Sequence, residues 1–212
     1  MPRVRVHQHV NPLAPYFQEL SPPINFKKIF AGPTQPLHLD IGCARGRFLL
    51  KMAQRKLGWN FLGLEIRAPL VAEANRIKNE SSLVNLHYEY CNATISLGNV
   101  LKKLKPGILQ MVTIQFPDPW FKKRHFKRRM VKLSLINDIA EHLSPGGRVF
   151  IQSDVAEVAE EICGFFAENS AFKLLKSKTF KKNPFPVKTE REAAVEEKGL
   201  PVYRAMFEKV LM

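Results

Sequence analysis

Apolar runs alternate with amphipathic stretches along the chain from residue 37 onward. Short apolar runs between turn residues are typical of buried strands, and apolar positions three and four residues apart are typical of helices. The pattern predicts strands at 37–41, 60–64, 84–90, 109–116 and 148–152, and helices at 46–56, 69–79, 94–104, 128–143 and 155–168. This alternation predicts an α/β protein with a mostly parallel sheet, right-handed crossovers and helices on both faces.

The two ends of the chain depart from this alternation. Residues 1–35 contain six prolines and no sustained period, so we expect a basic, irregular arm, disordered in part, before a single domain at 36–212. Residues 172–180 and 202–210 alternate enough to form an antiparallel pair of strands at one edge of the sheet. The polar stretch 181–199 between them predicts a long loop, either functional or mobile.

Composition narrows the choice of partner. The chain has 33 Lys and Arg against 19 Asp and Glu, a formal charge of +14, which favours a polyanion such as nucleic acid. No apolar run approaches the roughly 18 residues of a spanning helix and no signal-peptide pattern opens the chain, so we expect a cytoplasmic protein that does not bind membrane. Three well-separated cysteines indicate neither a disulfide framework nor a zinc site, and we expect no metal.

The segment that follows the fourth predicted strand carries the most specific chemistry. Pro117 and Pro119 have fixed φ angles, so Asp118 between them has few backbone states available. Six cations follow at 122–129, interleaved with aromatic residues, a combination that suits phosphates and stacked bases. Alone, such a basic run could be a solvated helix face or a localisation signal. Its place directly after a rigidly held carboxylate favours chemistry on a nucleobase.

A turn containing glycine follows the first predicted strand and would let a ligand approach the backbone closely. It is a poor dinucleotide fingerprint, because Ala44 replaces the second glycine and Arg47, whose bulk should obstruct close helix–strand packing, replaces the third. It is not a P-loop either, since no Gly-Lys-Ser/Thr follows. The carboxylate of Asp40 would repel a pyrophosphate but could receive the cationic amino-acid part of S-adenosylmethionine.

Polar residues also end the next two strands. Glu65 stands where a carboxylate can accept hydrogen bonds from both hydroxyls of a ribose, and Asn92 stands where an amide can meet an adenine edge. Asp40 and Glu65 could instead cap helices or form ion pairs. Three polar residues at successive strand ends favour S-adenosylmethionine as the cofactor.

In several motifs the chain resembles the bacterial tRNA (guanine-N7-)-methyltransferases, which are Rossmann-like class I S-adenosylmethionine-dependent enzymes. The similarity extends from residue 37 to residue 210. Its specific motifs are Asp40-Ile41-Gly42, Phe116-Pro117-Asp118-Pro119-Trp120, Ser153-Asp154 and Thr189-Glu190-Arg191-Glu192. The resemblance implies methyl transfer to N7 of the guanosine at position 46, in the variable loop of tRNA, with tRNA as partner.

The resemblance also implies roles for individual residues. The S-adenosylmethionine site would be lined by Asp40, Gly42, Glu65, Asn92 and Asp118, with Asp118 also the catalytic residue. Substrate would be contacted by Lys122, Asp154, Thr189, Glu190, Arg191 and Glu192.

Two positions depart from the family pattern, which usually has Gly-x-Gly in the turn and an aspartate after the third strand. Ala44 fits the turn if that position does not need a positive φ. Asn92 keeps an acceptor and adds donors.

Guanine N7 already has an exposed lone pair, so its methylation needs no general base. We hypothesise that Asp118 holds the guanine edge and stabilises the positive charge that develops on the purine. Trp120 or Phe121 could stack on the base, although Trp120 could equally pack beneath the site, and Ser153-Asp154 could equally be a helix N-cap.

The alternatives are a nicotinamide-dependent oxidoreductase, a non-enzymatic RNA-binding module, or a methyltransferase for ribosomal RNA or protein. The sequence leaves open whether the protein is a monomer or a homodimer.

Overall fold

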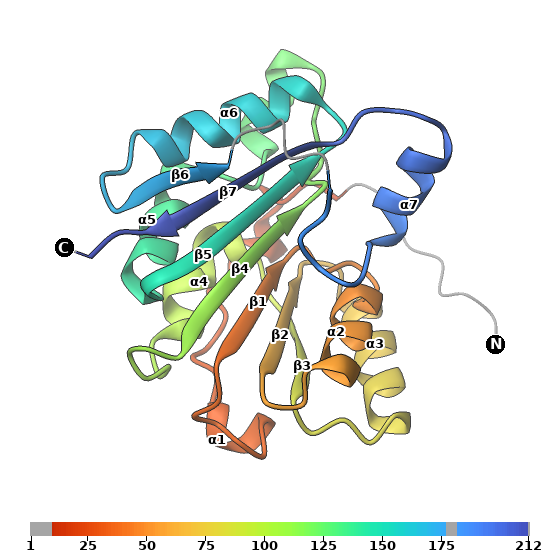
Figure 1. Cartoon of the computed structure of the whole chain (residues 1–212), viewed down its shortest axis with the longest axis vertical. Helices are drawn as coiled ribbons and strands as arrows, with labels where there is room; N and C mark the ends of the chain where they lie inside the picture. The colour runs from red at the N-terminus through yellow and green to blue at the C-terminus, as the bar shows by residue number, and fades with distance from the viewer. Residues whose placement is uncertain (1–9, 177–181, 212) are drawn as a thin grey trace.

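A computed structural model describes residues 10–176 and 182–211, and in this part of the chain seven strands form one sheet (Figure 1). The strands are β1 (Leu37–Ile41), β2 (Asn60–Glu65), β3 (Leu86–Tyr90), β4 (Leu109–Gln115), β5 (Leu143–Ser153), β6 (Phe172–Lys176) and β7 (Tyr203–Lys209). Their order is β3-β2-β1-β4-β5-β7-β6; β1 to β5 are parallel, and β7 runs antiparallel to both β5 and β6. The predicted α/β architecture with an antiparallel edge is confirmed.

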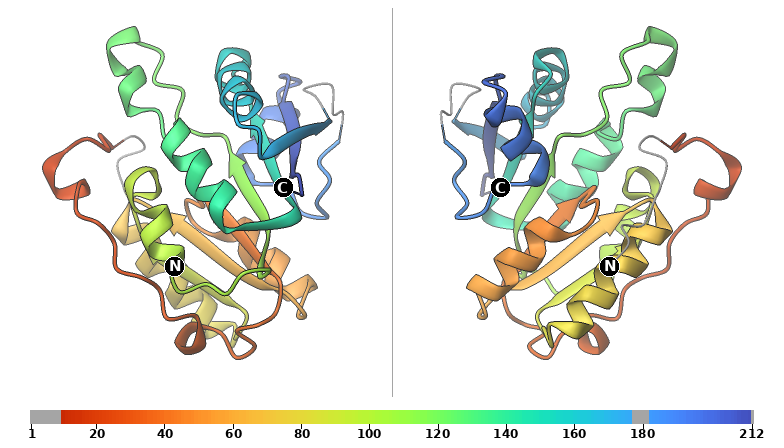
Figure 2. Two further views of the ribbon diagram at one scale, coloured as in Figure 1. Left: turned by 90° about the vertical axis from the view of Figure 1, so that its left-hand side faces the viewer. Right: turned by 90° about the vertical axis from the view of Figure 1, so that its right-hand side faces the viewer.

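Helices cover both faces of the sheet because side chains alternate along the strands. In β1, Leu37 and Leu39 belong to a core with α4 (Ala93–Leu101), α5 (Leu133–His142) and α6 (Ala156–Ala167). On the other face, Phe61 and Tyr88 belong to a second core with α2 (Arg47–Arg55) and α3 (Ala68–Glu80). Figure 2 shows α4 and α5 packed side by side on their face.

The helix predicted at 128–143 was wrong at its start, because α5 begins at Leu133. Residues 123–128 form a separate short 3-10 helix, η2 (Lys123–Arg128). Two contacts break the helical pattern: the buried side chain of Arg129 binds Glu161 on α6, and Thr94 donates a hydrogen bond to the carbonyl oxygen of Met130. Residues 144–147 lie within the bounds of β5, as an irregular stretch where its register with β4 shifts.

The stretch 181–199 was predicted as a loop, and it contains a helix, α7 (Glu190–Glu197). The helix begins with a capping box, in which the Thr189 side chain accepts from the Glu192 amide and the Glu192 side chain accepts from the Thr189 amide. The predicted strand 172–180 is described only as far as residue 176, because residues 177–181 lie outside the described residues.

The amino-terminal segment packs against α4. It contains η1 (Pro15–Phe17) and α1 (Phe26–Ile29) and is otherwise irregular over residues 10–35. Ile24, Phe26 and Phe30 are buried in the same core as α4, and the Ile24 amide donates to the carbonyl oxygen of Val100 at 3.1 Å. Residues 1–9, on which part of the predicted disorder falls, lie outside the described residues.

Candidate functional site

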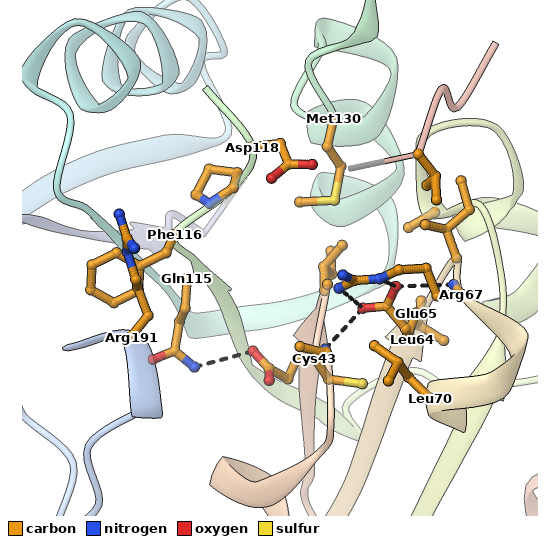
Figure 3. Close-up of a pocket in the computed structure, with 18 of the residues that line it drawn as sticks. Cys43, Leu64, Glu65, Arg67, Leu70, Gln115, Phe116, Asp118, Met130 and Arg191 are labelled. Carbon is orange, nitrogen blue, oxygen red and sulfur yellow. Dashed lines mark hydrogen bonds and ion pairs between the residues drawn. The ribbon is translucent and has the colours of Figure 1, made fainter. Parts of the chain in front are cut away.

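A cavity of about 1260 Å³ lies at the carboxyl ends of β1, β2 and β4, where open parallel sheets bind ligands (Figure 3). Its walls come from the β1–α2 turn, from the segment after β4, from the start of α7 and from the amino-terminal segment. Residues far apart in the sequence are therefore brought together around one space.

The β1–α2 turn is tightly wound. Gly42, Ala44 and Gly46 all have positive φ, at 80°, 50° and 67°. Ala44 was expected to fit the turn if its φ were not positive, and its φ is positive. A left-handed conformation costs a non-glycine residue about 1–2 kcal/mol. A Cβ at Gly46 would lie 2.3 Å from the Tyr88 ring, so Gly46 provides the close helix–strand approach. Arg47 does not obstruct it, because its side chain is half exposed and pairs with Glu190.

Asp40 is a buried carboxylate held by neutral groups. Its Oδ1 accepts from Thr113 Oγ1 at 2.6 Å and from Gln115 Nε2 at 3.2 Å; the second bond is dashed in Figure 3 beside the labelled Gln115. Burial raises the pKa of Asp40 to about 6 despite these hydrogen bonds, and the nearby Glu65 adds to the rise. Within the described residues Asp40 neither pairs with a cation nor caps a helix, so it is well placed to receive a cationic ligand group.

Glu65 forms an ion pair with Arg67, which was one of the two structural roles that the sequence left open for it. It accepts from the Ala44 amide at 2.9 Å and from the amide of Arg67 at 3.0 Å. The Arg67 guanidinium adds bonds of 2.7 and 3.1 Å to its two oxygens, as Figure 3 shows. These bonds engage the acceptor positions of the carboxylate. Ribose hydroxyls can therefore bind Glu65 only by sharing with, or replacing, Arg67.

Asn92 fastens the amino-terminal segment to the pocket. Its Nδ2 donates to the carbonyl oxygens of Pro12, at 3.3 Å, and Phe17, at 3.0 Å. Both amide hydrogens are thus used, and Asn92 can offer a ligand only its Oδ1 acceptor. An adenine amino group can still donate to that oxygen, as it could to an aspartate. Val10 and Pro12 line the cavity as a result.

The segment after β4 is strained on both sides of Asp118. Phe116 and Trp120 have φ of 51° and 45°, which is unusual for bulky residues and costs on the order of 1–3 kcal/mol each. Asp118 lines the cavity near Met130 (Figure 3). Burial lowers the pKa of Arg67, but its bonds and attraction to Glu65, with a smaller contribution from Asp118, raise it overall. The Asp118 carboxylate is therefore electrostatically coupled to the Glu65–Arg67 pair.

The six cations of the basic run differ in environment. Lys122, Lys123, Arg124 and Lys127 are exposed, and Lys122 does not line the cavity. Arg128 lines it, with its guanidinium 5.0 Å from the centre of the Trp120 ring.

Arg129 has a structural role, because it is buried and binds the Pro119 carbonyl oxygen, Glu161 and Glu157. Trp120 and Phe121 also line the cavity; Trp120 contacts His125 edge-on, and Phe121 is 72% exposed.

The start of α7 forms the wall opposite. Thr189, Glu190 and Arg191 line the cavity, and Arg191 pairs with Asp154, which lines it too. Asp154 does not cap α6; the Ser153 hydroxyl accepts from the amide of Val155 instead.

The fourth residue of the α7 motif lies apart from the cavity. Glu192 is fully buried behind the wall, where it binds Arg204 at 2.7 Å and Asn183 at 2.6 Å. It is therefore not placed to touch a ligand in the cavity directly.

Sequence reasoning missed several residues of this site. Arg128 was seen only as part of the basic run, yet its buried Nε has no hydrogen-bond partner within the described residues. The partners of Asp40 were missed too, although Gln115 and Gln152 are polar residues inside apolar strands and could have signalled a buried network. The described residues include no cluster of three or more side chains suited to a metal ion, and none of their helices is long and apolar enough to cross a membrane.

Comparison with known proteins finds methyltransferases. The sequence profile of a family described as "Putative methyltransferase" matches residues 34–205. A tRNA (guanine-N(7)-)-methyltransferase from Trichormus variabilis is 57% identical over 211 residues, covering 99% of this chain and 98% of the relative. A protein of the same name from Synechococcus elongatus is 54% identical over 207 residues, covering 98% and 97%.

Solved structures agree on the fold. A geranyl diphosphate C-methyltransferase from Streptomyces coelicolor, solved with S-adenosyl-L-homocysteine, has a TM-score of 0.56 at 15% identity and covers 84% of this chain and 73% of that one. An rRNA methylase from Streptococcus thermophilus has a TM-score of 0.52 at 12% identity and covers 88% and 92%. At these identities the likeness concerns the fold alone.

Proposed function

The chain belongs to the tRNA (guanine-N7-)-methyltransferase family, and we propose that it transfers a methyl group from S-adenosylmethionine to N7 of the guanosine at position 46 in the variable loop of tRNA. The observation that carries this proposal is one cavity holding two kinds of carboxylate. Asp40 is buried without a cation partner among the described residues, and Asp118 lies on the same cavity between two left-handed residues.

The donor set fits S-adenosylmethionine, which supplies an electrophilic methyl group on a sulfonium. Asp40 is a carboxylate suited to the ammonium of the methionyl part. Gly42 leaves the backbone open. Glu65 would accept from a ribose by sharing with, or replacing, Arg67, and Asn92 would accept from an adenine amino group. Asp118 would complete the lining of this site.

Asp118 would be the catalytic residue. Its carboxylate would accept hydrogen bonds from N1–H and the exocyclic amine of guanine, two donors that adenine does not present together. The same negative charge would stabilise the positive charge that forms on the purine as N7 is methylated. The strained residues on both sides support this role, because they hold the backbone that carries the carboxylate in an unusual conformation before substrate arrives.

The substrate side would consist of Lys122, Asp154, Thr189, Glu190 and Arg191, and Glu192 would act through the capping box rather than by contact. The exposed cations at 122–127 would bind tRNA phosphates, and the half-buried Arg128 would contact the RNA near the target base. We further propose that residues 36–212 form the methyltransferase domain, that residues 1–35 form a basic arm which assists tRNA binding, and that the enzyme works in the cytoplasm.

The test is product mapping. Unmodified tRNA, ribosomal RNA and total protein are each incubated with the enzyme and methyl-labelled donor. We expect label only in tRNA, as 7-methylguanosine at the variable-loop position. Label in ribosomal RNA or protein instead would assign a different acceptor, and binding of NAD in place of S-adenosylmethionine would favour an oxidoreductase.

A further inference from the structure

Two side-chain amides, one on the cavity wall and one buried behind it, link the Asp40 side of the cavity to α7. Gln115 and Gln152 are direct neighbours across the β4–β5 pair. Gln115 Nε2 donates to Asp40 at 3.2 Å, and Gln115 Oε1 accepts from Gln152 Nε2 at 2.9 Å. Gln152 Nε2 also donates to Glu192 at 3.3 Å, and Gln152 Oε1 accepts from Arg204 Nε at 3.2 Å. Gln152 is fully buried, so among the residues that the structure describes its amide has only these partners to satisfy it.

The groups at the two ends of this chain determine how both amides are oriented. An arginine can only donate hydrogen bonds, and an ionised carboxylate can only accept them. Arg204 therefore requires the oxygen of Gln152 on its side, which leaves the Gln152 nitrogen facing Gln115. The oxygen of Gln115 must then face Gln152, and its N–H groups must face Asp40. No other orientation of the two amides gives hydrogen bonds to Arg204, to Asp40 and between Gln115 and Gln152 at the same time.

The same residues hold the opposite wall. Arg204 binds Glu192 at 2.7 Å and Glu196 at 2.8 Å, and both of these glutamates belong to α7. Glu192 closes the capping box that starts the helix, and that start places Thr189 and Arg191 on the cavity. Gln152 therefore contacts both the network that orients Asp40 and the residue that fixes the start of α7.

We infer that Gln152 is a positioning residue: by orienting the Gln115 amide it keeps a hydrogen-bond donor on Asp40, and by binding Glu192 it joins the donor-binding side of the cavity to the wall formed by α7. This inference rests on the proposed function, because it assumes that Asp40 receives the ammonium of S-adenosylmethionine. Gln152 does not line the cavity, so it is not placed to touch either substrate. Its effect should therefore appear only through Asp40 and α7.

Two ligands separate positioning from general damage to the site. S-adenosylmethionine carries the methionyl ammonium, whereas 5′-methylthioadenosine has the same nucleoside without the amino-acid part. Loss of a hydrogen bond to a charged group typically changes affinity by about 10-fold. We expect Gln152→Met to weaken S-adenosylmethionine binding by about 10-fold and to leave methylthioadenosine binding within about 2-fold. Gln110→Met is the control: Gln110 lies on β4 with Gln115, and within the described residues its side-chain amide bonds only to the Gly107 carbonyl oxygen, so neither affinity should change.

A double-mutant cycle shows whether the effect passes through Gln115. In the Gln115→Met background the Asp40 network is already broken, so adding Gln152→Met should weaken S-adenosylmethionine binding no further. Additive losses, or equal losses for both ligands, would overturn the inference while leaving the proposed function intact. If the wild-type protein binds no S-adenosylmethionine, the proposed function and the inference both fail.

A measurement on the unmutated protein covers the case in which Gln152→Met does not fold. The side-chain amide signals of Gln115 and Gln152 are followed by NMR in protein labelled with ¹⁵N-glutamine, with Gln115→Met identifying the first. We expect both signals to shift on binding S-adenosylmethionine and neither to shift on binding methylthioadenosine. A Gln152 signal that does not respond to S-adenosylmethionine would overturn the inference.

Discussion

The two sides of the cavity hold their charged groups in opposite ways. On the side proposed for S-adenosylmethionine, the methyl donor, Asp40 and Glu65 are each 3% exposed and accept several hydrogen bonds. We call this the donor side. On the side proposed for substrate, the cations at 122–124 lie exposed beside the cavity and Phe121 is 72% exposed, and the backbone is strained on both sides of Asp118. A small ligand that is the same in every turnover can be met by a buried, preorganised site, whereas a large polyanion needs accessible charge.

This contrast predicts that each side of the cavity determines the affinity for a different ligand. Changes on the donor side should alter the affinity for S-adenosylmethionine and leave RNA binding intact. Changes in the basic segment should alter RNA binding and leave donor affinity intact. Asp118 lies between the two sides and should govern the chemical step.

The largest effect is expected at Asp118. Asp118→Ala removes a positioned negative charge and should lower the single-turnover rate of methyl transfer by at least about 100-fold. Asp118→Asn keeps the shape and should lose nearly as much, because the charge is what stabilises the developing cation. The rate is measured at saturating donor and tRNA. An unchanged rate for either variant would show that Asp118 has no catalytic role.

The next effect is on donor affinity. Asp40→Asn keeps an acceptor for Thr113 and Gln115 but loses the charge that would bind the ammonium. We expect the dissociation constant of S-adenosylmethionine to rise by roughly 10- to 100-fold, the range for a lost hydrogen bond between charged groups. Calorimetric titration measures it, and tRNA affinity in the same variant serves as the control. Equal weakening of S-adenosylmethionine binding and tRNA binding would contradict the proposal that the two sides bind their ligands independently.

The pH dependence of the same carboxyl gives a further test. Burial raises the pKa of Asp40 from 3.8 to about 6, so the fold disfavours its ionised form. This carboxyl therefore lowers stability above about pH 6, and the penalty disappears as the pH falls below 3.8. Donor affinity should fall as the pH drops through about 6, while the stability advantage of Asp40→Asn, measured by denaturant unfolding, should shrink. A pH-independent donor affinity between about pH 5 and 8 would contradict this role.

A smaller effect is expected from the exposed cations. Lys122→Gln should weaken tRNA binding a few-fold and reduce the slope of log affinity against log salt by about one, as loss of one phosphate contact does. Lys103→Gln, another exposed lysine but outside the cavity and the basic segment, is the matched control. If Lys122→Gln instead slows turnover with tRNA affinity unchanged, Lys122 acts at the reacting base.

The smallest effect concerns the strained turn. Ala44→Gly relieves a positive φ at the cost of greater chain entropy in the unfolded state, so it should raise the free energy of unfolding by about 1 kcal/mol or less. Ala53→Gly, inside α2, should lower it by about the same amount or more. Destabilisation by Ala44→Gly would mean that the Ala44 methyl group contributes packing that outweighs the strain.

The elements that sequence predicted well are those with strong local signals. The predicted bounds of β1 were confirmed, because five buried residues lie between Pro36 and the glycine that begins the turn. The start of α5 was wrong because contacts of Arg129 and Met130 with other helices override the local periodicity. Helix α7 was missed although Thr189 and Glu192 form a capping box, since its segment lacks a continuous apolar face.

The candidate site was predictable in position and less so in detail. Asp40, Glu65 and Asp118 meet at one cavity because the carboxyl ends of parallel strands converge. Their partners were not predictable. The bonds from Arg67 to Glu65 and from Asn92 to the amino-terminal segment depend on side-chain and tertiary arrangement that no local pattern encodes.

The most direct measurement uses a tRNA in which the single atom to be methylated is replaced. A transcript with 7-deazaguanosine at variable-loop position 46 has a carbon in place of N7 and otherwise keeps the base. We predict that the enzyme binds this tRNA and S-adenosylmethionine as tightly as it binds the normal substrates and transfers no methyl group to it. Methyl transfer to the deaza transcript at the normal rate would contradict the account.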